Sequence, residues 1–253
     1  MRLMKAGLSL AVAAFLASCA STASKTPIEQ PYQPNYQYSV SPAAEKSDVT
    51  VGIIAPQFTG SGLEYWKGNK EDAAAREAIR ALRSSFESLL TAKGFNTAGP
   101  YESLDDMTFP EKKGCDFVFY PELDLEGKVV ISNQQTENQT SFTDALLGGS
   151  SLVMVCDQTV SLSGSVQIIA REPLSNEKMW VKRFAMTGAP QTFRGSGITC
   201  GGTVVTREVH NAWIKMHEAM YQEIMQGLDK FVSAEEFQML KRQAAELRAK
   251  KTY

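Results

Sequence analysis

Hydrophobic and polar positions change period several times along the first half of the chain. The β-branched run Val49–Ile54, stopped by Pro56, predicts a buried strand. The glycine-rich segment Phe58–Asn69 favours a loop. Helical spacing follows within Glu71–Lys93, and Gly94 stands where a C-terminal cap is expected, so this segment predicts a helix. The apolar residues at that spacing are Ile79, Leu82, Phe86 and Leu89.

The middle of the chain alternates between strand-like segments and polar or glycine-rich stretches. A short strand is expected to start at Phe95, before polar turns over Pro100–Pro110. The further predicted strands are Cys115–Leu125 and Lys128–Ser132, joined at Gly127, and the hairpin of Thr159–Arg171 with Lys178–Met186, which turns about Pro173–Asn176. Loops are predicted over Asn133–Thr143, which is almost entirely polar, and over Gly188–Gly202.

From about Arg207 the chain is predicted to be helical. The apolar stripe of this helix is Trp213, Met220, Ile224 and Leu228, broadened by Met216, Tyr221 and Phe231. Ser233 and Glu236 form a capping-box motif, so a second helix is expected to begin there. This last helix carries Phe237, Leu240, Ala244 and Leu247 on one face. Because its other positions are strongly charged, we expect it to project beyond the core.

The order of strand, helix, several strands and then helices predicts the fold class. We expect an α/β or α+β domain, in which helices pack on a mixed sheet and two helices form a C-terminal extension. The predicted division is a leader over 1–18, a lipidated cysteine and tether over 19–46, a single α/β domain over 47–232 and a charged C-terminal helix over 233–253.

The first residues have the features of a lipoprotein signal peptide. Arg2 and Lys5 precede the apolar stretch Ala6–Leu16, which has the length of a leader and is too short for a permanent membrane span. It runs into Leu16-Ala17-Ser18-Cys19, a lipobox whose cysteine is the predicted lipidation site. An ordinary secretory leader cleaved near Ala20 is the alternative. Since residue 20 is Ala rather than Asp, the outer membrane is favoured over retention in the inner membrane.

Residues 20–46 are rich in Ser, Thr, Pro, Gln and Tyr. Their prolines disfavour regular helix and favour an extended path, so this segment is predicted to tether the domain to the membrane. Those prolines are Pro27, Pro31, Pro34 and Pro42.

Charge and cysteine content narrow the classes of function further. The chain has 26 basic and 28 acidic residues, and removal of Arg2 and Lys5 with the leader makes the mature protein more acidic still. This argues against a nucleic-acid partner. Of the cysteines beyond Cys19, Cys115 is predicted to be buried, whereas Cys156 and Cys200 are predicted to form a disulfide in an oxidising compartment. Their spacing does not suit a zinc site.

Several motifs bear on catalysis or cofactor binding. The glycines around Gly195 and Gly201 precede a helix, but no βαβ unit and no P-loop Lys-Ser/Thr pair accompany them. His210 and His217 lie two turns apart on one predicted helix, a spacing that does not suit a metal site, so surface or edge-of-core positions are favoured. Two histidines without a nucleophile elbow do not suggest a hydrolase.

One acidic and one aromatic cluster each have a functional and a purely structural interpretation. Glu122, Asp124 and Glu126 alternate along one predicted strand face, which suits a solvated surface better than general acid–base catalysis. Tyr65 and Trp66 lie in a glycine-flanked loop, where they either stack on a sugar or cover the core. We therefore expect no enzyme activity, no cofactor and no metal.

The sequence resembles the neuraminyllactose-binding haemagglutinin (HpaA-like) lipoproteins of Helicobacter and its relatives, which are also described as flagellar sheath adhesins. The resemblance covers most of the mature chain, although its middle matches only in pattern. The segments that carry it are Ser41–Lys46, Ala55–Phe58, Leu90–Phe95, Ile224–Lys230 and Lys241–Lys250. None of them is a catalytic signature.

The resemblance implies a surface or flagellar-sheath lipoprotein that binds sialylated host glycans. The segment proposed for sialate recognition in that family is rich in Lys and Arg, whereas the corresponding Asn133–Thr140 has no basic residue. A sialate carboxylate needs a guanidinium or ammonium partner. If this protein binds sialate, the basic contacts must come from elsewhere, and the candidates are Arg183, Arg194 and Arg207.

Two functions remain in competition. The first is a membrane-anchored, adhesin-like surface lipoprotein without catalysis, whose partner is a host glycan. The alternative is a periplasm-facing envelope scaffold or assembly lipoprotein that binds other proteins through its C-terminal helices. The cell surface or flagellar sheath is favoured over the periplasmic face of the outer membrane.

Overall fold

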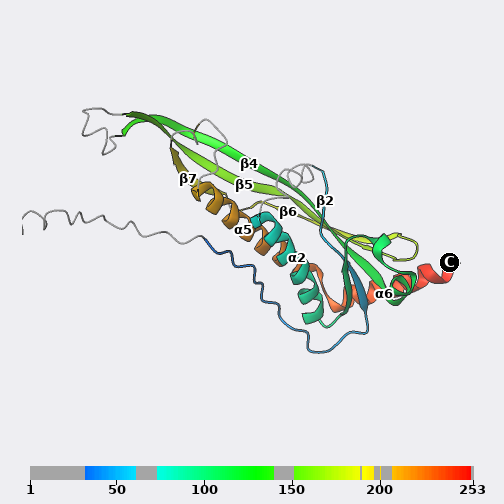
Figure 1. Cartoon of the computed structure of the whole chain (residues 1–253). Helices are drawn as coiled ribbons and strands as arrows, with labels where there is room; N and C mark the ends of the chain where they lie inside the picture. The colour runs from blue at the N-terminus through cyan, green and yellow to red at the C-terminus, as the bar shows by residue number, and fades with distance from the viewer. Residues whose placement is uncertain are drawn as a thin grey trace, which may run out of the picture. The chain divides into compact units, whose positions relative to one another are not determined.

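A mixed sheet organises the domain (Figure 1). The computed structural model describes residues 32–60, 73–139, 151–188, 190–196, 200 and 207–251. The strands in this part of the chain are β1 (Thr50–Ile54), β2 (Gln57–Phe58), β3 (Asn96–Tyr101), β4 (Phe117–Gln139), β5 (Ser151–Arg171), β6 (Lys178–Met186) and β7 (Gln191–Ser196). The sheet order is β3-β1-β4-β5-β6, with β2 beside β4 and β7 beside β5.

The sheet combines parallel and antiparallel pairing. β1 lies parallel to β3 and β4, whereas β4, β5, β6 and β7 pair antiparallel. The helix between β1 and β3 provides the crossover that a parallel pair requires. The predicted mixed sheet with helices packed on it is confirmed, and its arrangement is that of an α+β fold.

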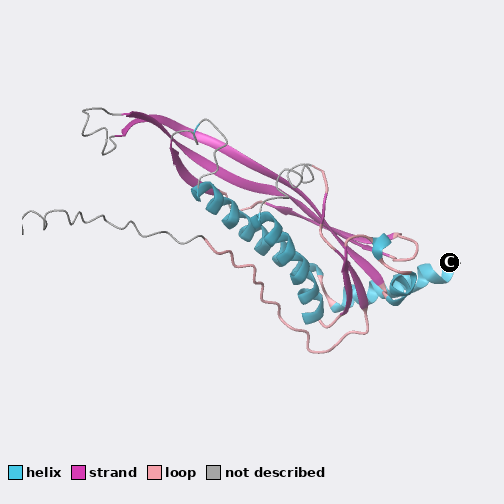
Figure 2. Cartoon of the chain, in the orientation of Figure 1, coloured by secondary structure: helices cyan, strands magenta, loops and turns pink. Residues whose placement is uncertain are grey.

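Three longer helices lie on one face of the sheet (Figure 2). They are α2 (Ala73–Ala92), α5 (Arg207–Phe231) and α6 (Ala234–Lys250). Leu82 and Phe86 of α2 and Met220 of α5 pack against strand residues such as Phe119 in the main core. The short helices η1 (Leu104–Asp106) and α3 (Phe109–Gly114) follow β3, and a smaller apolar cluster there joins Ile54, Met107, Cys115 and Val118.

The long hairpin of β4 and β5 departs from the prediction. Gly127 does not divide two strands, because it lies within β4 and pairs with Leu162. The polar segment from Asn133 is also strand as far as Gln139, interrupted by a register shift between Ser132 and Gln135. Backbone pairing with β5 does not require apolar side chains, so polarity alone gave the wrong prediction of a loop. Residues 140–143 lie outside the described part.

The predicted loop Gly188–Gly202 also contains a strand. β7 pairs with β5 from Val155↔Ser196 to Val160↔Gln191. From Gln191 to Arg194 its side chains alternate between half-buried and exposed positions without a strong apolar period, which explains why the sequence pattern missed it. Within this segment, residues 189, 197–199 and 201–202 lie outside the described part.

The segments before and after the predicted domain, the tether and the last helix, both contact it. In the predicted tether, Tyr38 donates a hydrogen bond to Asp229 at 3.0 Å, and the ring of Tyr36 packs on Tyr221. At the other end, the first part of α6 packs into the core, because Phe237, Leu240 and Ala244 are buried, and the charged residues after Ala244 are mostly exposed. Ser233 accepts a hydrogen bond from the Glu236 backbone N–H, as its capping motif predicts. No helix in the described residues is long and apolar enough to cross a membrane.

Candidate functional site

The structure brings together one pair of residues singled out in the sequence. Cys156 and Cys200 form a disulfide with their Cα atoms 5.6 Å apart, and it ties the segment after β7 to β5. Cys115 is a free, buried thiol, as predicted. Cys19 and the Tyr65-Trp66 pair lie outside the described residues.

The candidate metal and acid–base groups do not assemble into a reactive centre. His210 is exposed, whereas His217 is buried on the inner side of α5, with its ring 6.3 Å from that of Trp213. Glu122 accepts a hydrogen bond from Gln167 of the neighbouring strand at 3.0 Å. Among the described residues, no group of three or more His, Cys, Asp or Glu side chains is placed to hold a metal ion.

A cleft with both polar and apolar lining lies beyond the ends of β1 and β3, beside the part of β4 that continues past them. Its volume is about 260 Å³. Ligands in α/β sheets commonly bind outside the carboxyl ends of parallel strands, which is where this cleft lies. Its lining residues are Ile54, Gln57, Glu102, Ser103, Leu104, Tyr120, Glu122, Arg171 and Asn176.

Arg171 is the basic group of the cleft. Its Nη1 donates to the backbone oxygen of Asn176 at 3.0 Å and to the side-chain oxygen at 3.3 Å. The guanidinium carbon lies 5.3 Å from the centroid of the Tyr120 ring. Within the described part of the chain no carboxylate lies within ion-pair distance of Arg171. Its Nε and Nη2 edge therefore remains available to a carboxylate, which a guanidinium binds with two parallel hydrogen bonds.

Other side chains of the cleft are held by hydrogen bonds. Arg83 engages both carboxylate oxygens of Glu102, at 2.6 and 2.7 Å, so that this acid is already neutralised. Gln57 donates to the backbone oxygens of Ala55 and Glu102, both at 3.0 Å. These contacts fix the rim of the cleft before any ligand arrives, which lowers the entropic cost of binding.

The row of polar groups continues across the open face of the sheet. The register places Gln57 beside Glu122, Glu122 beside Gln167, and Gln167 beside Arg183. Side chains directly across from each other in a sheet share a face. The cleft therefore adjoins a ladder of amide, carboxylate and guanidinium groups suited to hydroxyl-rich ligands.

Tyr120 stays protonated at neutral pH. Burial raises the pKa of Tyr120 to about 12, although the nearby Arg171 acts in the opposite direction. The phenol hydroxyl is therefore a hydrogen-bond donor in the cleft. With Arg171 for a carboxylate and Glu122 for hydroxyl or amide N–H groups, the arrangement suits a small acidic ligand with neighbouring donors.

Sequence reasoning missed this cleft. Tyr120 lay in a predicted strand and Arg171 at the end of another, about fifty residues later, so only the register between β4 and β5 shows that they meet. The one available signal was Arg171 itself, a long cation that ends an otherwise apolar strand. Of the basic residues considered earlier, Arg183 lies two strands away from Glu122, and Arg194 lies at a different cavity.

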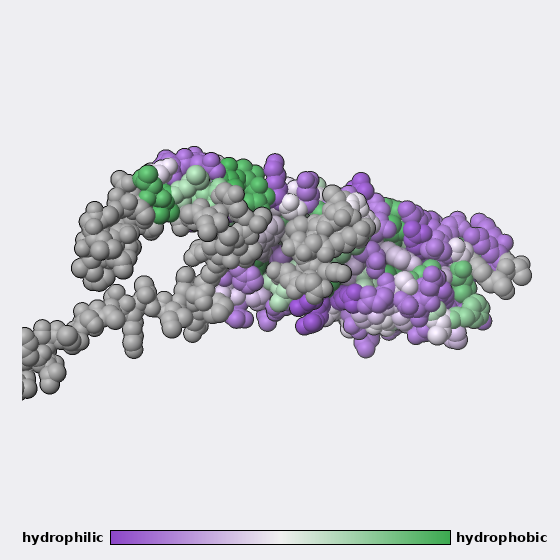
Figure 3. Space-filling model, turned by 45° about the horizontal axis from the view of Figure 1, so that its top comes forward, coloured by the Kyte–Doolittle hydropathy of each residue, from purple (hydrophilic) through white to green (hydrophobic). Residues whose placement is uncertain are grey.

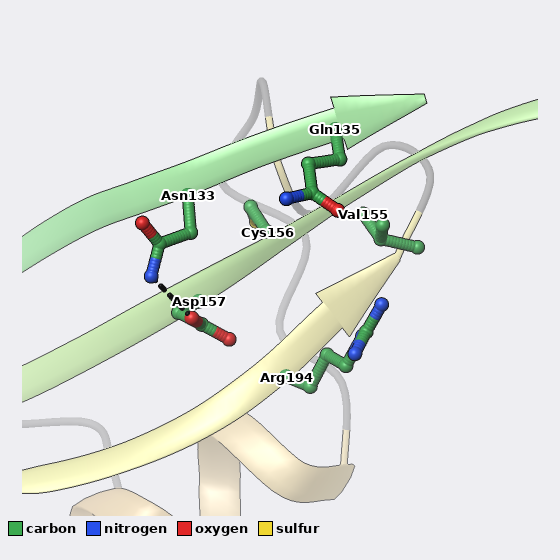
Figure 4. Close-up of a pocket in the computed structure, with 6 residues that line it drawn as sticks. All are labelled: Asn133, Gln135, Val155, Cys156, Asp157 and Arg194. Carbon is green, nitrogen blue, oxygen red and sulfur yellow. Dashed lines mark hydrogen bonds between the residues drawn. The ribbon is translucent and has the colours of Figure 1, made fainter. Parts of the chain in front are cut away.

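The second cavity is smaller, about 140 Å³, and lies beside the disulfide (Figure 4). It is lined by Asn133, Gln135, Val155, Cys156, Asp157 and Arg194. Its charged side chains are already paired, because Asp157 accepts a hydrogen bond from Asn133 at 2.8 Å and Arg194 forms an ion pair with Glu137. A carboxylate ligand here would have to displace Glu137, so the Arg171 cleft is the better candidate.

Neither a family model nor a curated protein matches this sequence. Among solved structures, the fold is similar to that of a Helicobacter pylori protein described as a "putative neuraminyllactose-binding hemagglutinin homolog". The TM-score is 0.52 at 14% identity, over 85% of this chain and 100% of that chain. The two chains share a fold. At this identity the likeness extends no further than the fold.

Two weaker matches were also found. Lipoprotein GNA1162 from Neisseria meningitidis gives a TM-score of 0.25 at 12% identity, over 58% of this chain and 83% of that chain. A minor lipoprotein from Acinetobacter baumannii gives 0.26 at 8% identity, over 72% of this chain and 92% of that chain. At these scores neither match carries an argument about this protein.

Proposed function

We propose that this protein is an adhesin-like lipoprotein of the bacterial envelope, which binds acidic, sialylated glycans in the Arg171 cleft and catalyses no reaction. The observation that carries the proposal is the guanidinium of Arg171, which is positioned by Asn176 and Tyr120 and has no carboxylate partner among the described residues. The Helicobacter pylori protein with the shared fold is described as a homolog of a neuraminyllactose-binding haemagglutinin, and neuraminyllactose is a ligand of the same chemistry.

A sialyl group satisfies the cleft better than a neutral sugar does. Its carboxylate matches the free edge of Arg171, and its hydroxyl and amide N–H groups supply donors for Glu122. Lactose alone leaves the guanidinium without a charged partner. Because the contact with Arg171 is partly exposed, we expect binding to weaken as the salt concentration rises.

The anchoring and location are proposed from the sequence. Cys19 carries the lipid, the segment that follows links it to the domain, and the outer membrane is the destination. Replacement of Cys19 by Ser is expected to abolish palmitate incorporation and release the protein from the membrane fraction. Labelling of intact cells with an impermeant reagent then separates a surface or sheath position from the periplasmic face.

The binding test uses residues 20–253 without the lipid. Sialyllactose and lactose are titrated into the wild type, Arg171→Ala and the control Arg194→Ala, whose ion pair lies at the second cavity. We expect sialyllactose binding in the wild type and the control, and its loss in Arg171→Ala. Loss only in Arg194→Ala would move the site to the second cavity. If the wild type binds neither sugar at millimolar concentration, the glycan proposal is wrong.

The alternative function, an envelope scaffold that binds other proteins, needs a different binding surface from the C-terminal helices first expected. The apolar side chains Phe237, Leu240 and Ala244 of α6 are buried in the domain, so they are not available to a partner protein. Most of the large apolar side chains that stay exposed in the described residues lie on the long hairpin, at Val129, Val130, Ile131, Leu152 and Met154. A protein partner is therefore expected at the hairpin and not on the buried face of the C-terminal helix.

A further inference from the structure

The second half of β4 is an open sheet edge. On its inner side it pairs with β5, with a single interruption at the register shift between Ser132 and Gln135. On its outer side β2 covers only Glu122 and Leu123, and no described strand pairs with the residues beyond. The backbone N–H of Thr59 donates to the oxygen of Leu123 at 2.9 Å, so the main-chain groups of Leu123 point outward. Alternation along a strand gives Leu125, Gly127, Val129 and Ile131 the same orientation.

This edge carries apolar side chains that the domain does not cover. Val129, Val130 and Ile131 are 48%, 42% and 40% exposed. Figure 3 shows an apolar patch over this part of the hairpin. An open edge of this kind is a template for another strand. The free stretch is bounded by β2 at one end and by the register shift after Ser132 at the other.

We propose that this edge pairs antiparallel with the same edge of a second copy of the chain, about a two-fold axis at Val130. In this register Val130 faces its own copy, Val129 faces Ile131 of the partner, and Lys128 faces Ser132 of the partner. Apolar residues meet apolar residues on both faces, and no like charges oppose each other. The same patch serves both copies, as a two-fold interface requires.

Two registers further along the edge bring unfavourable side chains together. An axis at Lys128 would place two ammonium groups opposite each other. An axis at Gly127 would set Val130 against Asp124. Because the edge is complementary to itself in the Val130 register, we infer that the strand paired with it belongs to a second copy of the chain. The inference rests on strand pairing and exposure alone and is independent of glycan binding.

The pairing test measures the mass of residues 20–253 by sedimentation equilibrium over micromolar concentrations. We expect a monomer–dimer equilibrium for the wild type. Val130→Lys places two like charges at the axis and should raise the dimer dissociation constant at least about tenfold. The matched control is Val181→Lys, since Val181 is 46% exposed but lies on β6. It should dimerise like the wild type.

A cross-link tests the register directly. Because the outward main-chain groups belong to the odd-numbered residues, Val130 forms a non-hydrogen-bonded pair with its copy, in which Cα atoms lie about 4.5 Å apart. This separation suits a disulfide. Oxidation of Val130→Cys should therefore give a covalent dimer, and Val181→Cys should not. A wild type that stays monomeric to about 100 µM, a concentration scale typical of weak association, overturns the proposal. Dimerisation unaffected by Val130→Lys, or lost in Val181→Lys, overturns it equally.

Discussion

Arg248, in the last turn of α6, donates from its Nε to a carboxylate oxygen of Glu172 at 2.8 Å. The Glu172 side chain is fully buried, whereas that of Arg248 is 25% exposed. The Nη2 of Arg248 also donates to the backbone oxygen of Cys115 at 2.7 Å. One guanidinium thus connects the C-terminal helix to the β5–β6 turn and to the segment that leads into β4.

Replacement of Arg248 by Ala is expected to destabilise the domain substantially. The change leaves the Glu172 carboxylate buried without its cation, and breaking a buried pair from one side costs about 3 kcal/mol or more. Urea unfolding of residues 20–253 measures the loss. The control is Lys251→Ala, because the Lys251–Glu177 pair has both side chains more than 40% exposed. That pair should contribute less than about 1 kcal/mol. Equal effects of the two changes would contradict the prediction.

Stability should also fall in acid because of Glu172. Burial alone would raise the pKa of Glu172, but the hydrogen bonds from Arg248 and from the Ser175 backbone outweigh it and hold the pKa below the ordinary value of 4.5. A carboxyl group whose pKa is lower in the folded protein than in the unfolded chain stabilises the fold at pH values above the pKa of the unfolded chain. This stabilisation is lost as the pH falls through the pKa of the folded protein. The unfolding free energy, measured from about pH 7 to about pH 3, should decrease below about pH 4.5, and less steeply in Glu172→Gln. The same slope in both proteins would exclude Glu172 as a cause.

The two kinds of cysteine should behave differently toward reagents. Burial raises the pKa of the Cys115 thiol to about 11, so it should resist alkylation in the folded state. The disulfide closes a loop of sequence separation 44, and its reduction should lower stability by about 4 kcal/mol on a chain-entropy estimate. Mass spectrometry of residues 20–253 after alkylation is expected to show no modified thiol in the native protein and one after denaturation. Native alkylation at Cys156 or Cys200 would show that the disulfide is not formed.

The sequence predicts those parts of the fold whose side chains repeat with one period. The helix within Glu71–Lys93 and the hairpin Thr159–Arg171 with Lys178–Met186 are confirmed for this reason, and Gly94, with a φ of 85°, takes the expected capping conformation. The distal part of β4 was missed because its side chains are exposed on both faces, so no apolar alternation marks it.

Some features of the structure depend on contacts between residues far apart in the sequence, which local sequence patterns do not predict. Gly164 lies in mid-strand with a φ of 150°, and a Cβ there would come within 2.0 Å of the Asp124 backbone oxygen. Its role becomes visible only once β4 and β5 are paired. The same holds for the candidate cleft, because Tyr120, Arg171 and Glu102 come from three separate strands or their ends. Hydrophobic periodicity predicts which side chains are buried, but it does not predict which polar side chains meet.

The geometry of Arg171 gives the last prediction, for the variant Arg171→Lys. Lysine keeps the positive charge but lacks the planar fork that binds a carboxylate with two hydrogen bonds and packs on Tyr120. If the cleft recognises a carboxylate through that fork, sialyllactose binding should weaken at least about tenfold. The unfolding free energy should change little, because Arg171 is partly exposed and its hydrogen bonds to described residues all go to Asn176 in the adjoining turn. Wild-type affinity in Arg171→Lys would mean that charge alone holds the ligand, and unchanged binding in Arg171→Ala would remove Arg171 from the site.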